Sequence, residues 1–294
     1  MPTKMTTVSR ILLILLLLPP AMAAWGKTAQ TAAVALTPSQ AKALVERALS
    51  GELRTVRDQN HPMRYLLRKA SPRLTTTKEI LETRDGDVAR LVAVFDRPLN
   101  DAEEAREQAR LDGLLDDPER QRHRKQSEEG DLGIVLKLLR MLPKAYIYQY
   151  AGSGSGPGGT VEKFNFRPDP NFSPPDLESQ ALTAMTGEIW IDAAHERVAR
   201  LEGHLQQDTN YGWGVLGKLN KGGSIVIEQG EVADQQWRIA RFKMQMELRI
   251  LFKTRNIDTT EEMTRYEVVP PGINYREAIR LLRAGPGGTA HGGR

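Results

Sequence analysis

The clearest hydrophobic pattern in the chain is an alternation of apolar and polar residues over positions 242–253. Every second residue is apolar up to Phe252, and Leu251 is the one exception. Period two over this length predicts a β-strand with one apolar face and one wet face. At about 3.3 Å per residue such a strand is long for a compact domain, so we expect it to curve or bulge.

The phase of this alternation changes just ahead of Phe242. Trp237 and Ile239 have the opposite parity from Phe242, so the slip falls near Ala240 and Arg241. An extra residue in one strand of an antiparallel pair bends that strand. We therefore predict a β-bulge at this position.

Further strand-like segments occupy much of the chain, and turns rather than helices join those of the C-terminal half. They cover residues 63–70, 74–83, 88–95, 145–150, 161–167, 185–191, 198–205, 224–229 and 259–269. Strands joined by turns disfavour a parallel βαβ architecture. The pattern predicts an α+β fold: a strongly curved antiparallel β-sheet, or incomplete barrel, covered by helices.

Helix signals fall before the first strand, in one central block and after the last strand. Thr37 can cap a helix that Gly51 closes. Asn100 begins a helical block over about 100–142. Asn274 can cap a short final helix.

The N-terminus has the three parts of a secretory signal peptide. Lys4 and Arg10 form a basic segment, residues 11–18 are aliphatic, and Ala-Met-Ala at 21–23 suits a signal peptidase. The aliphatic run is much shorter than the roughly 20 residues that span a bilayer. We therefore expect an exported protein, periplasmic or secreted, with no transmembrane span in the mature chain.

This prediction divides the chain into three parts. Residues 1–23 are the signal peptide, and residues 24–269 form a single α+β domain with a helical insertion at about 100–142. Residues 270–294 are expected to form a short helix and a disordered, glycine-rich tail.

The net charge and the absence of cysteine exclude some kinds of binding partner and covalent modification. Without Lys4 and Arg10, a net charge of about +2 remains, which is too small to indicate a nucleic-acid-binding protein. The chain has no cysteine, which excludes both disulfides and an N-terminal lipid attached to cysteine.

Motifs for catalysis, metals and cofactors are nearly absent from the sequence. The glycine-rich stretch 152–159 lacks the Gly-Lys-Ser/Thr ending of a phosphate-binding loop, so we interpret it as a hairpin connection. The aromatic-glycine stretch 211–217 is interpreted as an ordinary connection, with a ligand lid as the alternative. We expect no cofactor and no metal.

Two histidines leave one enzymatic hypothesis open. His195 and His204 fall around one predicted hairpin, with Asp192 and Glu196 nearby. Two histidines and a carboxylate could form a hydrolytic site. The favoured interpretation is a turn followed by a solvent-facing strand residue.

The remaining candidates for a binding site are apolar side chains that could line a cavity. If the helices do not fill the curved sheet, an apolar cavity remains between them. Its candidate lining residues are Trp190, Phe242, Met244 and Met246. Methionine is flexible and suits varied apolar ligands. The alternative is that these side chains pack beneath the helices as core.

One hairpin carries a family resemblance. The segment Gly-Glu-Ile-Trp-Ile-Asp at 187–192, followed by Val-Ala-Arg-Leu at 198–201, resembles a hairpin of the periplasmic outer-membrane lipoprotein-sorting proteins. These include the LolA and LolB carriers and the RseB-type sensor domain, and the similar layout spans residues 36–269. The resemblance implies an incomplete barrel, capped by helices, that binds acyl chains in its concavity. The helical block 100–142 is longer than in the carriers, and no binding residue transfers by position.

Three functions therefore remain, in order of preference. The first is a non-enzymatic exported envelope protein that binds lipid or lipoprotein acyl chains in the concavity of the sheet. The second is a structural or protein-partner-binding envelope protein with a filled core. The third is a hydrolase that uses His195 or His204 with Asp192.

Overall fold

The computed structural model describes residues 36–55, 60–211, 217–250 and 253–284. All of them belong to one compact unit, Val34–Arg294. The predicted signal peptide, the glycine-rich tail and most of the 211–217 stretch lie outside the described residues. The fold and the site below are those of this unit.

Four α-helices and two short 3₁₀ helices occur in the described part of the chain. They are α1 (Pro38–Thr55), α2 (Asp101–Asp116), α3 (Pro118–Ala145), η1 (Glu178–Ala184), η2 (Ala233–Gln235) and α4 (Tyr275–Ala284). Asn100 caps α2 in a full capping box with Glu103, as the sequence predicts. Gly51 does not end α1, contrary to prediction. It lies beneath the Arg197 side chain, where the helix continues for another turn.

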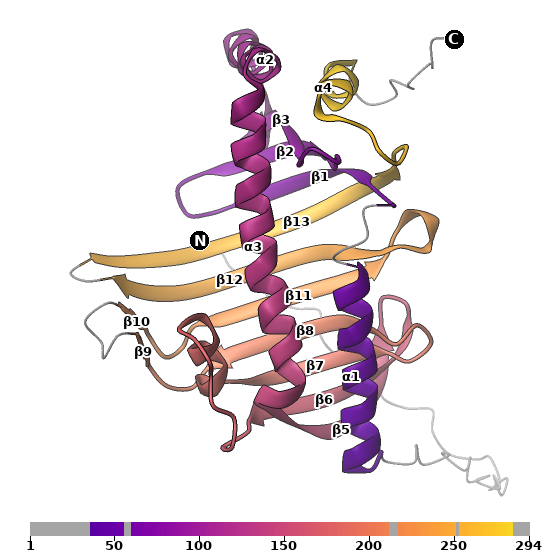
Figure 1. Cartoon of the computed structure of the whole chain (residues 1–294), viewed down its shortest axis with the longest axis vertical. Helices are drawn as coiled ribbons and strands as arrows, with labels where there is room; N and C mark the ends of the chain where they lie inside the picture. Colours follow the sequence, from indigo (N-terminus) through magenta and orange to yellow (C-terminus); the bar gives the residue numbers. More distant parts are fainter. Residues whose placement is uncertain (1–35, 56–59, 212–216, 251–252, 285–294) are drawn as a thin grey trace, which may run out of the picture. The chain divides into compact units, whose positions relative to one another are not determined.

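The strands join into one antiparallel sheet of thirteen described strands (Figure 1). The first seven are β1 (Met63–Ala70), β2 (Thr75–Leu81), β3 (Val88–Val94), β4 (Arg97–Pro98), β5 (Tyr146–Gly156), β6 (Gly159–Pro168) and β7 (Met185–Asp192). The others are β8 (Arg197–Leu205), β9 (Thr209–Tyr211), β10 (Gly217–Leu219), β11 (Ser224–Glu231), β12 (Trp237–Ile250) and β13 (Lys253–Val268).

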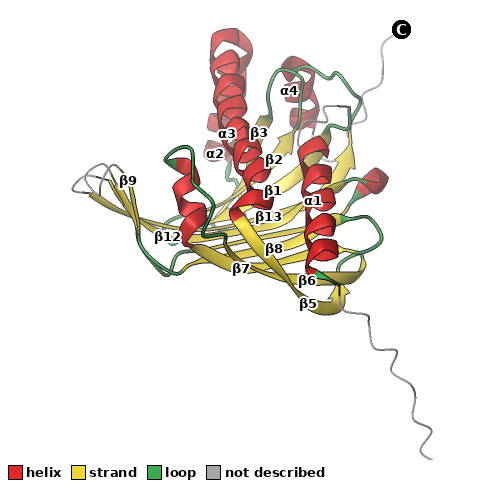
Figure 2. Ribbon diagram, turned by 60° about the horizontal axis from the view of Figure 1, so that its bottom comes forward, coloured by secondary structure: helices red, strands yellow, loops and turns green. Residues whose placement is uncertain are grey.

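The sheet is open. Its main path runs β4-β3-β2-β1-β13-β12-β11-β8-β7-β6-β5, so β4 and β5 form its two edges. Figure 2 shows the sheet bent, with α1 and α3 on one side of it. This arrangement confirms the predicted α+β fold with a curved antiparallel sheet covered by helices.

The long strand β12 contains the predicted bulge. Glu228 of β11 pairs with Arg241, but the next residue, Gln229, pairs with Ile239, which leaves Ala240 as the extra residue. Because of this extra residue, Ile239 lies on the same face of the strand as Phe242, so the apolar side chains before and after the bulge point to one side.

The end of this strand differs from the prediction. The alternation was expected to continue through Phe252, but β12 ends at Ile250, which pairs with Lys253 at the start of β13. Residues 251 and 252 lie outside the described residues.

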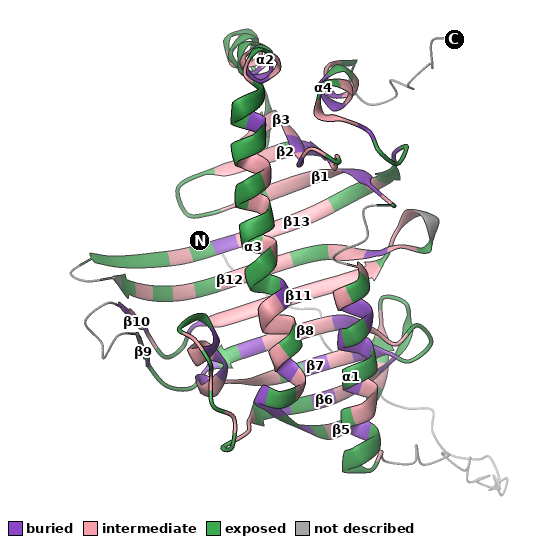
Figure 3. Ribbon diagram, viewed as in Figure 1, coloured by how far each residue is buried: buried purple, intermediate pink, exposed green. Residues whose placement is uncertain are grey.

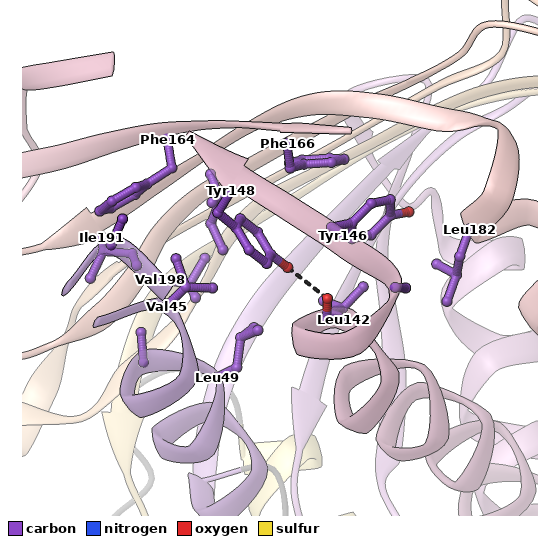
Figure 4. Packing of buried hydrophobic residues seen from close by; sticks show 14 residues of the cluster. Val45, Leu49, Leu142, Tyr146, Tyr148, Phe164, Phe166, Leu182, Ile191 and Val198 are labelled. Carbon is purple, nitrogen blue, oxygen red and sulfur yellow. Dashed lines mark hydrogen bonds between the residues drawn. The ribbon is translucent and has the colours of Figure 1, made fainter. Parts of the chain in front are cut away.

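The main core lies between β5–β8 and the two covering helices (Figure 4). Phe164 and Ile191 of the sheet meet Val45 and Leu49 of α1, while the Tyr148 hydroxyl donates to the Leu142 carbonyl of α3 at 2.9 Å. A second core joins α2 and α4 to β2 and β3. Its buried members are Leu81, Val88, Leu111, Leu114, Val269, Ile273, Ala278, Ile279 and Leu282.

Candidate apolar binding face

One face of the sheet carries the apolar side chains and faces the helices. Residues that pair across strands point to the same side of a sheet. Ile189, which packs in the core with α1, pairs with Leu201. Leu201 pairs with Ile227, which in turn pairs with Phe242. We call this side of the sheet the inner face, and the opposite side the outer face.

At the centre of the inner face lie four apolar side chains that are only partly buried. We call Ile225, Ile227, Phe242 and Met244 the central strip. Ile225 pairs with Met244 and Ile227 with Phe242, so the four form one continuous patch across β11 and β12. Figure 3 shows intermediate burial along the middle of these two strands, in contrast to the buried segments nearer β5.

Helix α3 crosses in front of this part of the sheet (Figure 1). Its main packing partners are α1, α2, β5 and η1, which it meets toward its two ends. Over residues 126–135, the helix is exposed apart from the half-buried Glu128 and Leu132. The middle of α3 therefore passes the central strip without closing tightly onto it.

The middle of α3 also leaves apolar side chains uncovered. Leu132, Val135 and Leu139 follow at spacings of three and four and share one side of the helix. Leu139 packs against the main core, yet Val135 is 47% exposed. Its neighbour Ile134 is 42% exposed. Apolar surface thus faces water on both the helix and the sheet.

A pocket of about 600 Å³ adjoins this region. It is bounded by the end of α1, the β2–β3 turn, the middle of α3, the start of β12 and the connection before α4. Its apolar lining includes Leu132, Trp237, Ile239 and Ile273. A volume of this size is typical of small-molecule sites.

Three carboxyl groups line the pocket from separate segments. Burial, together with the neighbouring charges of Glu82 and Glu128, raises the pKa of Asp87 to about 7. Burial also raises the pKa values of Glu82 and Glu128. Each glutamate accepts a backbone hydrogen bond: Glu82 from Met63 at 2.9 Å, and Glu128 from Asp87 at 3.0 Å. The sequence did not indicate this group, because only the fold brings positions 82, 87 and 128 together.

Of the four residues predicted to line a cavity, the structure brings three to the inner face. Phe242 and Met244 belong to the central strip. Met246 shares their face and packs against a small cluster with Leu205 and Leu219.

Trp190 lies on the outer face, away from the other three. Its ring has the Lys163 ammonium 3.9 Å from the centroid, and its indole N–H donates to Glu188 at 3.0 Å. The neighbours Ile189 and Ile191 are the inward-facing side chains of β7. The grouping of Trp190 with Phe242 was therefore wrong, and strand parity gives the reason: adjacent residues point to opposite faces.

The two-histidine site does not form. His195 lies 2.8 Å from Asp192, whose carboxylate also accepts the backbone N–H of His195 and so closes the turn before β8. His204 pairs with Glu202 at 2.9 Å near the far end of β8. Seven residues of β8 lie between the two histidines, which at about 3.3 Å per residue places them more than roughly 20 Å apart. Among the described residues, no group of three or more histidines, aspartates and glutamates is placed to hold a metal.

Within the described residues, none of the helices combines the length and the apolar character that crossing a bilayer requires.

Comparison with known proteins finds similarity to solved structures alone. No family model matches the chain, and no curated protein matches it. One similar solved structure is described as an outer membrane lipoprotein-sorting protein domain from Vibrio parahaemolyticus. It has 11% identity, covers 79% of this chain and 96% of its own, and gives a TM-score of 0.30. Another is MucB in complex with MucA(peri), with 12% identity, 76% and 94% coverage and a TM-score of 0.22.

The description of the first structure names the same family that the hairpin at 187–201 resembles. Both TM-scores are far below 0.5, and a likeness of this degree does not determine what a protein binds. The function follows instead from the chain's own residues.

Proposed function

We propose that this protein is a non-enzymatic exported envelope protein that binds lipid or lipoprotein acyl chains on the inner face of its sheet. The observation that carries the proposal is the central strip, where four adjacent apolar side chains stay partly exposed beneath α3. Apolar surface left in contact with water stabilises a complex when a ligand covers it, at about 25 cal/mol per Å².

The chemistry of the strip favours a hydrocarbon ligand over a polar one. Its four residues offer no hydrogen-bonding side-chain group, and Met244 is flexible enough to follow the shape of a chain. Val135 of α3 adds exposed apolar surface. A chain held between sheet and helix would be covered from both sides.

Export supports the same proposal. The basic, aliphatic and small-residue parts of the first 23 residues are those of a secretory signal. An exported protein meets lipids and lipoproteins in the periplasm or outside the cell.

The test uses a charge placed in the strip. Wild-type protein is expected to bind fluorescently labelled palmitate and to retain lipid after native purification. Met244→Glu is expected to weaken probe binding at least ten-fold, because an unpaired charge is costly on an apolar surface. Gln245→Glu is the matched control: the exposed neighbour points to the outer face, and its affinity should equal that of wild type.

Two outcomes would count against the proposal. If the wild-type protein neither binds the probe nor retains lipid, the inner face is not a lipid site. The alternative, a structural or partner-binding envelope protein, would then be favoured. Equal losses in the two variants would show that the effect is not local to the strip. Circular dichroism of both variants confirms that they are folded.

A further inference from the structure

The central strip leads directly into the pocket. Ile239 lines the pocket and shares the inner face with Phe242 because of the bulge at Ala240. On the helix above, Leu132 lines the pocket one turn before Val135. A ligand with its chain on the strip would therefore have its head in the pocket.

The pocket contains three carboxyl groups that lack a close ion pair among the described residues, although Arg124 and Arg238 act on them from a distance. None of the three carboxyl groups, Glu82, Asp87 and Glu128, has an ion-pair partner within 4 Å among the described residues. Buried charges are normally paired, since desolvation without a partner is costly. A cationic group of a ligand would supply that partner.

Arg84, Lys125 and Arg238 are the basic residues among the described lining of the pocket, and Arg84 lies 4.0 Å from Asp85. Lys125 donates to the Arg84 carbonyl at 2.9 Å and lies 3.8 Å from Glu129. Arg238 donates to the His61 carbonyl at 2.9 Å. Five acidic residues stand beside these three basic ones in the described lining, so the lining favours a positive ligand group over a negative one.

A separate feature of the lining is a buried hydrogen-bond donor. Trp237 is only 3% exposed, lines the pocket, and has no acceptor for its indole N–H among the described residues. A buried donor without an acceptor is uncommon in folded proteins and costs stability. An oxygen of a ligand would satisfy it.

We propose that the pocket binds the head of the ligand, and that this head carries a protonated amine together with a hydrogen-bond acceptor. The amine lies among Glu82, Asp87 and Glu128, and the acceptor receives the Trp237 N–H. This proposal rests on the proposed function, because it assigns the head of the same amphiphile whose chain lies on the central strip. Amino alcohols and their esters belong to this class.

The first experiment compares two heads on one chain. Dodecylamine and dodecanoate compete against labelled palmitate at pH 7.5. Dodecylamine is expected to displace the probe at about ten-fold lower concentration, which is the effect of one charge-assisted hydrogen bond. Equal displacement, or a preference for dodecanoate, overturns the proposal.

Matched variants locate the effect. Glu128→Gln is expected to remove most of the amine preference and to leave dodecanoate binding within two-fold of wild type. Asp131→Asn makes a similar charge change on the exposed side of α3 and should keep the preference. If both variants lower the preference for dodecylamine equally, that preference reflects the net charge of the protein, and the pocket does not cause it.

The second experiment needs no acyl chain. Ethanolamine is expected to change the tryptophan fluorescence of wild type and of Met244→Glu alike, and to leave Trp237→Phe unchanged. No response in wild type overturns the headgroup proposal even if labelled palmitate binds. A response in a protein that binds no palmitate shows that the pocket holds amines while the proposed lipid function fails.

Discussion

Two regions of the inner face have the same alternation of apolar and polar residues, but helices bury one region and leave the other partly exposed. Near β5, the residues Phe164 and Ile191 are fully buried beneath α1 and the C-terminal half of α3. On β11 and β12, Ile227 and Phe242 point to the same side but stay partly exposed. Alternation thus decides which side of a strand is apolar, whereas the packing of helices decides whether that side is filled.

The covering helices differ in the same way. Over the filled region, α1 presents the fully buried Ala41, Val45 and Ala48. The middle of α3 differs: over residues 126–135, Glu128 and Leu132 are half-buried and the other residues are exposed. This part of the helix therefore buries little apolar surface of its own.

The largest expected difference comes from truncating one phenylalanine in each region. Phe164→Ala should lower the free energy of unfolding by about 3–5 kcal/mol, because it opens a cavity in a closed core. Phe242→Ala should lower it by about 1 kcal/mol, since water already reaches that side chain. Urea denaturation of the two variants measures both values. Equal losses would show that the central strip is as well packed as the core.

The pH dependence of stability provides a second, smaller contrast. The pKa of Asp87 is raised to about 7 in the folded protein, so the folded state holds its proton more tightly than the unfolded chain does. The free energy of unfolding should therefore fall as the pH rises from about 4 to about 7. Burial, Glu82 and Glu128 raise this pKa, and Arg124 opposes them.

Replacing the carboxyl group tests this assignment. Asp87→Asn should flatten the profile over this pH range and should make the protein more stable than wild type above pH 7. Asp131→Asn, on the exposed surface of α3, should leave the slope unchanged. Urea titrations at several pH values give the slopes, and an unaltered slope in Asp87→Asn would assign the dependence to other groups.

The smallest expected change in stability comes from a substitution on α3. Val135→Ser should alter the free energy of unfolding by less than about 0.5 kcal/mol, because the side chain is already half exposed. It should still weaken binding of labelled palmitate several-fold if α3 covers the bound chain, since it removes exposed apolar surface from the helix. The comparison is Leu139→Ser, four residues further along, which should destabilise the main core. No loss of probe affinity in Val135→Ser would remove α3 from the binding face.

Several predictions from local pattern agree with the structure because they depend on near neighbours. The bulge at Ala240 follows from a change of phase within one strand. The capping box at Asn100 follows from a spacing of three residues. The open antiparallel sheet follows from strands joined by turns.

The wrong predictions concern positions whose structure depends on residues far away in the sequence or on the direction of a strand. Gly51 was expected to end α1, but the side chain of Arg197 packs against it and Glu52 accepts two hydrogen bonds from that guanidinium. Trp190 was grouped with Phe242 as an apolar candidate to line a cavity, although its strand parity places it on the outer face with Lys163. The grouping of His195 with His204 treated residues nine positions apart as neighbours, which an extended strand does not allow.

By itself, the sequence determined the antiparallel strands, the side of β12 that is apolar and the start of the helical block, because periodicity and capping act over a few residues. Only the tertiary structure decided that α3 spans the central strip without filling it, and that Glu82, Asp87 and Glu128 meet in one pocket. Those outcomes depend on packing between segments tens of residues apart, and no local pattern encodes the space that such packing leaves open.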